Sequence, residues 1–74
     1  MSFRPKYKVI TYYQSGENAG IRHECRYCFT LEEARARREF FIELDNVKSF
    51  ILLPTIWELR QNEDNTFDFY YLEG

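Results

Sequence analysis

The sequence predicts an α+β domain in which a single helix packs on one face of an antiparallel sheet of four strands. Two observations support this fold class. Apolar and polar residues alternate on both sides of one central stretch, and only that stretch combines a helix start signal with helical periodicity. The predicted order of elements is therefore ββαββ. A chain of 74 residues has room for one hydrophobic core, so we expect residues 1–74 to form a single domain.

Two strands are predicted before the helix. Side chains alternate between two faces along residues 6–14 and again along residues 21–29. Residues 15–20 contain two glycines and no apolar side chain larger than alanine, which favours a hairpin loop. We therefore expect the two strands to pair with each other in an antiparallel hairpin.

The helix is predicted over Leu31–Leu44. Thr30 followed three residues later by Glu33 is the pattern of a capping box, in which each residue satisfies a backbone N–H at the helix start. Asp45 and Asn46 follow the last periodic apolar residue, and Asn46 can adopt the left-handed conformation that ends a helix. These signals predict a helix of about four turns.

A long extended region is predicted after the helix. Val47–Leu53 is apolar at positions of both faces, which is typical of a central strand. Pro54 lacks a backbone N–H, so the strand should bulge or break there, giving a fifth strand if Pro54 splits it. Thr55–Gln61 resumes the strand, and Thr66–Leu72 forms the last one after a polar turn.

The chain has more large apolar side chains than one helix and one small sheet need, since 45% of its residues are hydrophobic and 19% are aromatic. The apolar arc of the helix, from Phe40 to Ile42, is wider than a single sheet contact and is interrupted by Arg37 and Arg38. The sheet face away from the helix is predicted to carry Ile10, Tyr12, Tyr70 and Leu72. This surplus predicts a homodimer.

Charge is distributed unevenly along the chain. Residues 1–48 hold nine Lys or Arg against seven Asp or Glu, whereas residues 49–74 hold one Arg against five acids, giving the net charge of −2. That net charge gives no general attraction to nucleic acid or to an anionic membrane surface. The N-terminal sequence has no apolar signal segment and no apolar run is long enough for a membrane span, so we expect a cytoplasmic protein without a membrane partner.

The residues that could support chemistry are few. Cys25 and Cys28 have the spacing of a zinc half-site, and His23 lies two residues before them. In an extended strand, however, residues 25 and 28 point to opposite faces, and no second cysteine pair completes four ligands. No serine stands in a motif with the single histidine, and no glycine-rich phosphate loop is present. We therefore expect no metal, no cofactor and no enzymatic activity.

Two functions remain. The first is protein binding, in which aromatic side chains supply affinity and neighbouring charges supply orientation. The residues expected at such an interface are Tyr12, Arg37, Arg38, Phe40, Trp57 and Tyr70. The alternative is nucleic-acid binding, because Arg22 and Arg26 are predicted to share a strand face and Tyr12 and Tyr70 could stack with bases on the open sheet face.

The helix start also resembles a known sequence layout. Residues Phe29–Ala34, with the sequence FTLEEA between a hairpin and a helix, resemble the F-T-x-E-E-A pattern of short uncharacterised ββαββ proteins of phages and mobile elements. The resemblance implies a compact accessory or inhibitor protein that binds a host macromolecule without a catalytic site. It assigns no functional residue in this chain.

Overall fold

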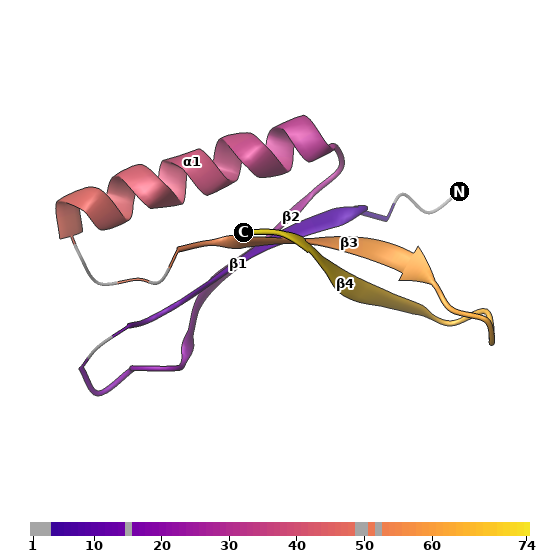
Figure 1. Cartoon of the computed structure of the whole chain (residues 1–74), viewed down its shortest axis with the longest axis horizontal. Helices are drawn as coiled ribbons and strands as arrows, with labels where there is room; N and C mark the ends of the chain where they lie inside the picture. Colours follow the sequence, from indigo (N-terminus) through magenta and orange to yellow (C-terminus); the bar gives the residue numbers. More distant parts are fainter. Residues whose placement is uncertain (1–3, 15, 49–50, 52) are drawn as a thin grey trace.

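The computed structural model confirms the predicted fold class, with four antiparallel strands in one sheet and one helix packed on one face of it (Figure 1). It describes residues 4–14, 16–48, 51 and 53–74. Along the chain the elements are β1 (Tyr7–Tyr12), β2 (Arg22–Cys28), α1 (Leu31–Lys48), β3 (Thr55–Gln61) and β4 (Phe67–Glu73). No other element of the described chain covers the opposite face of the sheet.

The strand order is β2-β1-β3-β4, so the two hairpins β1–β2 and β3–β4 meet through β1 and β3 at the centre of the sheet. The prediction of a central strand over Val47–Leu53 is wrong. Val47 and Lys48 belong to α1, and Ile51 forms only a single bridge with Tyr13. Residues 49, 50 and 52 of that prediction lie outside the described residues.

The strand predicted at Thr55–Gln61 is confirmed as β3. It begins directly after Pro54, which is buried. Proline has no N–H for a ladder hydrogen bond. Because Pro54 lies immediately before the strand, the sheet loses no hydrogen bond there. The central position of β3 follows from pairing with β1, in which Val9 lies opposite Ile56.

The predicted helix start is confirmed. The backbone N–H of Glu33 donates a hydrogen bond to Thr30 Oγ1 over 3.1 Å. The Glu33 carboxylate in turn accepts from the backbone N–H of Phe29, one residue earlier than in the usual capping box, over 3.3 Å. Both bonds satisfy backbone donors where the chain enters the helix.

The predicted helix end is wrong, because α1 continues four residues past Leu44 to Lys48. Asp45 and Asn46 lie within the helix. The Asp45 carboxylate accepts a hydrogen bond from the backbone N–H of Ile51 over 2.9 Å. Asp45 therefore holds the chain that returns from the helix to the sheet, a role that local sequence preference does not reveal.

The core lies between α1 and the sheet. Its fully buried apolar residues are Val9, Cys28, Ala34, Phe41, Ile51 and Ile56. Leu72 packs against this core, although it was predicted on the opposite face. The cause is a register shift between Ile56 and Trp57: Ile56 lies opposite Glu73 and Trp57 opposite Tyr71, which leaves Leu72 as the extra residue of a β-bulge.

The helix does not have the character of a membrane span. In the part of the chain that the structure describes, no helix is both long enough and apolar enough to cross a bilayer.

Replacement of Thr30 tests the helix start. The Thr30→Ala variant should lower the free energy of unfolding by about 1 kcal/mol, because the Glu33 N–H loses its acceptor. Urea denaturation followed by circular dichroism measures the change. The Thr30→Ser variant keeps the hydroxyl and should unfold close to the wild-type midpoint; equal losses in both variants would contradict the capping role.

Candidate functional site

The open face of the sheet has a row of aromatic and cationic residues that runs across all four strands. Residues directly opposite one another in an antiparallel ladder share a face. Lys8 lies opposite Tyr27 on β2 and opposite Trp57 on β3, and Trp57 lies opposite Tyr71 on β4. Their neighbours Val9 and Ile56 point to the core on the other face. The row therefore lies on the face that α1 leaves uncovered.

The side chains of this row form a cluster with one more ring, that of Phe69. The ring centroids of Tyr27 and Phe69 are 5.9 Å apart, and those of Trp57 and Tyr71 are 5.8 Å apart. The Lys8 ammonium lies 4.3 Å from the Phe69 centroid and 5.9 Å from that of Trp57, both within reach of a cation–π interaction. We call these five residues the open-face cluster.

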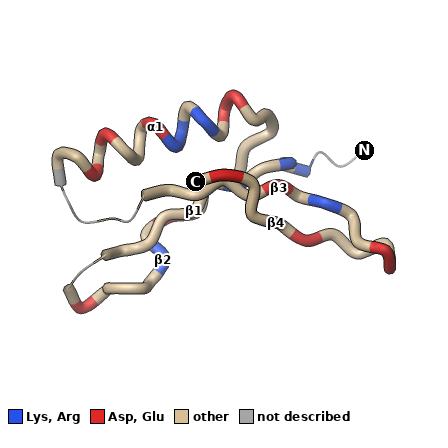
Figure 2. Tube along the Cα trace, in the orientation of Figure 1, with Lys and Arg blue, Asp and Glu red and all other residues tan. Residues whose placement is uncertain are grey.

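The acidic side chains of the strands lie on one face of the sheet only. In the ladder, every acidic residue of the four strands pairs with a residue that points to the helix side, so all of them lie on that side. They are Glu24, Glu58, Asp68 and Glu73. The open face has Lys8 and, opposite Tyr12, Arg22. The acids follow the β3–β4 hairpin toward its turn (Figure 2). Within the strands, the open face is therefore aromatic and cationic without an acid.

Two predicted pairings of site residues are wrong. Tyr12 and Tyr70 do not share the open face, because Tyr70 lies opposite Glu58 on the helix side and its hydroxyl donates to Asn62 Oδ1. Arg22 and Arg26 do not share a face either. A register shift inserts one residue near His23, so Arg26 faces the helix side opposite Val9 while Arg22 lies on the open face.

The same bulge moves His23 away from the predicted strand face. His23 Nδ1 and Thr11 Oγ1 are hydrogen-bonded at 2.9 Å, and the histidine ring lies 6.1 Å from that of Phe41. Cys25 lies on the open face opposite Ile10, and Cys28 is buried in the core, where burial raises the pKa of its thiol. The two cysteines thus face opposite sides, as predicted.

The candidate zinc ligands are therefore not brought together. Among the described residues, no three His, Cys, Asp or Glu side chains gather in a way that would hold a metal ion. The described surface also has no pocket of the kind that encloses a small ligand.

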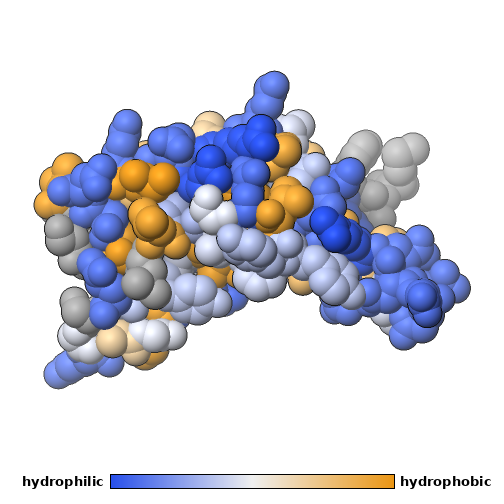
Figure 3. Space-filling view, in the orientation of Figure 1, coloured by the Kyte–Doolittle hydropathy of each residue, from blue (hydrophilic) through white to orange (hydrophobic). Residues whose placement is uncertain are grey.

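A second exposed surface lies on the flank of α1. Phe41 is buried in the core, but Phe40 remains 53% exposed, with the Arg37 guanidinium 5.9 Å from its ring centroid. Val47, two turns further along the helix, and Leu53, on the returning chain, are also exposed. Figure 3 shows apolar surface around the C-terminal end of α1, at the left of the view. We call Arg37, Phe40, Glu43 and Val47 the helix flank.

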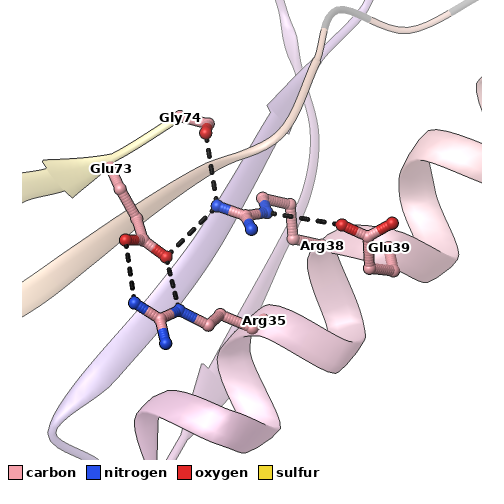
Figure 4. Close-up of polar contacts among 5 residues, drawn as sticks. All are labelled: Arg35, Arg38, Glu39, Glu73 and Gly74. Atoms are coloured by element: carbon pink, nitrogen blue, oxygen red, sulfur yellow. Dashed lines mark hydrogen bonds and ion pairs between the residues drawn. The ribbon is translucent and has the colours of Figure 1, made fainter.

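Arg38, one of the residues expected at an interface, binds the end of β4 (Figure 4). Arg35 donates to both carboxylate oxygens of Glu73, over 2.8 and 3.2 Å. Arg38 donates to the same carboxylate and to the backbone oxygen of Gly74, each over 3.2 Å. This clamp joins α1 to β4, and the hydrogen bond from Arg35 is the main cause of the lowered pKa of Glu73.

Comparison with known proteins gives no relative: no family model, no curated protein and no solved structure matches the chain.

The sequence indicates Trp57 and Phe40 as candidates for an interface, but it does not indicate Lys8 or Tyr27. Their common face depends on which strands are neighbours, and the pairing of β1 with β3 joins residues that are at least 45 positions apart in the sequence. The available signal was the alternation of Phe67, Phe69 and Tyr71 along the last strand, and the structure confirms that they share the open face.

Replacement of Glu73 tests the clamp through its pH dependence. Because the pKa of Glu73 is lowered in the folded state, the clamp stabilises the fold above the ordinary value of 4.5 and loses this effect as the pH falls through the lowered value. The Glu73→Gln variant should melt below the wild type at neutral pH, and the difference should narrow in acid.

Thermal unfolding between pH 3 and pH 7 measures this difference. Glu63→Gln removes the same charge in the exposed β3–β4 turn, far from the clamp, and should leave the melting temperature near that of the wild type. A Glu73→Gln deficit that is equally large at every pH would show that the carboxylate charge is not what the clamp depends on.

Proposed function

We propose that the protein is a non-enzymatic protein-interaction module that acts as a homodimer, with the helix flank as its self-association surface. The observation that supports this most is the position of Phe40, a large aromatic residue that is more than half exposed in the middle of an 18-residue helix. Exposed aromatic side chains of this size are enriched at protein interfaces.

The charges around Phe40 favour a second copy of the same chain as the occupant. Arg37 lies three residues before Phe40 and Glu43 lies three residues after it, and both are exposed. If two helices pack antiparallel about a twofold axis at Phe40, Arg37 of each copy lies opposite Glu43 of the other. A twofold interface is self-complementary in this way, so the two Phe40 rings would be flanked by two ion pairs.

Such a dimer leaves the open sheet faces free. α1 lies on one side of the sheet (Figure 1). The open-face cluster lies on the other side, because its residues alternate along the strands with the core residues Val9 and Ile56. Both open faces of the dimer therefore remain available to a partner.

The free thiols of Cys25 and Cys28 suit the reducing cytoplasm as the place of action. A protein-interaction role also agrees with the accessory function implied by the FTLEEA resemblance.

Charge reversal on the helix flank tests the proposal. Arg37→Glu should convert the dimer to a monomer, because it places two acids opposite each other at both ends of the interface. The double variant Arg37→Glu with Glu43→Arg restores opposite charges and should restore the dimer. Size-exclusion chromatography with light scattering measures the mass of each, and circular dichroism checks that each variant is folded.

A wild-type protein that is monomeric at tens of micromolar would refute the dimer. So would a double variant that stays monomeric while folded, since the self-complementary charge pattern would then have no role in association.

A further inference from the structure

The open-face cluster presents more ring surface than its own packing requires. Tyr27 is 56% exposed and Tyr71 is 57% exposed, at the two ends of a row that spans four strands. Neighbouring strands lie about 4.8 Å apart, so the row covers about 14 Å. Phe67, at the far end of β4, is also exposed, with the Arg4 guanidinium 5.5 Å from its ring centroid. The rings therefore form an extended strip.

The charge of this strip selects an anionic occupant. Lys8 stands in the middle of the row, Arg22 lies on the same face, and Arg4 stands over Phe67. The acids of the strands are all on the helix side. If two open faces packed against each other, they would bring cations toward cations, so a second copy does not fit this surface.

The flat rings distinguish between anionic partners. An acidic peptide would satisfy the cations but would leave the exposed faces of Tyr27 and Tyr71 without matching groups. Nucleic-acid bases stack on aromatic side chains, and cationic side chains next to the rings contact the phosphates of the same strand. A duplex keeps its bases stacked inside, so they cannot reach the rings. The matching partner has unpaired bases and a phosphate backbone.

We propose that the open face binds single-stranded nucleic acid, with bases stacked on Tyr27, Trp57 and Tyr71 and with phosphates at Lys8 and Arg22. The sheet supplies the binding platform and α1 supports it from behind, as in other four-stranded sheets that bind single strands through aromatic side chains. This inference is independent of the helix-flank dimer, because the two surfaces share no residue.

The test uses the full chain and a twelve-nucleotide oligothymidylate or oligouridylate with a fluorescent end label. Anisotropy measures binding, and the emission of Trp57, the only tryptophan, reports stacking at the site. We expect binding at low salt that weakens as salt rises, together with quenching of Trp57. A duplex of the same length and polyglutamate should bind much more weakly. Binding by both RNA and DNA would fit stacking, which does not depend on the sugar.

Two matched pairs of variants locate the site. Tyr71→Leu removes a ring from the open face, and Tyr70→Leu removes the neighbouring ring from the other face of the same strand. Tyr71→Leu should weaken binding about tenfold, and Tyr70→Leu should leave it unchanged. Arg22→Gln should lower the slope of log affinity against log salt by about 0.7, whereas Arg26→Gln, on the helix side of the same strand, should not.

Three results would overturn the proposal. They are no binding at low salt by the folded wild-type protein, equal losses for Tyr70→Leu and Tyr71→Leu, and binding of polyglutamate as tight as that of the oligonucleotide. The Arg37→Glu variant, expected to be a monomer, separates this proposal from the dimer proposal. The oligonucleotide should still bind its open face and quench the emission of Trp57.

Discussion

The packing of Phe41 and Ala34 of α1 against Val9 and Ile56 of the two central strands is the contact on which the rest of the structure depends. All four side chains are almost completely buried. Loss of a buried phenylalanine typically costs about 3–5 kcal/mol, a large part of the stability of a domain this small. One helix can cover only one face of a four-stranded sheet, so this contact also decides which face remains open to a partner.

Two β-bulges determine how side chains are sorted between those faces. The bulge in β2 turns His23 toward the helix and separates Arg22 from Arg26. The bulge in β4 brings Leu72 into the core and places Glu73 within reach of the arginines of α1. The acidic side chains of the strands therefore lie on the helix side, where Glu73 binds the arginines of α1. The open face keeps aromatic rings and cations. The difference in charge between the faces is thus a consequence of backbone geometry.

Much of the fold follows from local signals in the sequence, because they act over a few residues. The start of α1 at Thr30 is an example, since its cap needs only the next turn of chain. The end of α1 was mispredicted because Asp45 acts on the backbone of Ile51, six residues ahead. The candidate site was found only in part, because the common face of Tyr27 and Tyr71 depends on strands that pair across the whole chain and on bulges that shift their register.

The helix-covered face holds the hydrophobic core, and we propose that the opposite face binds a partner. The most direct measurement is a titration of ¹⁵N-labelled protein with single-stranded oligonucleotide, followed by two-dimensional NMR. We expect chemical-shift changes that cluster on the open face, at Lys8 and Tyr27 and at the indole N–H of Trp57, with little change along α1. Shifts confined to α1, or no shifts at low salt, would contradict it.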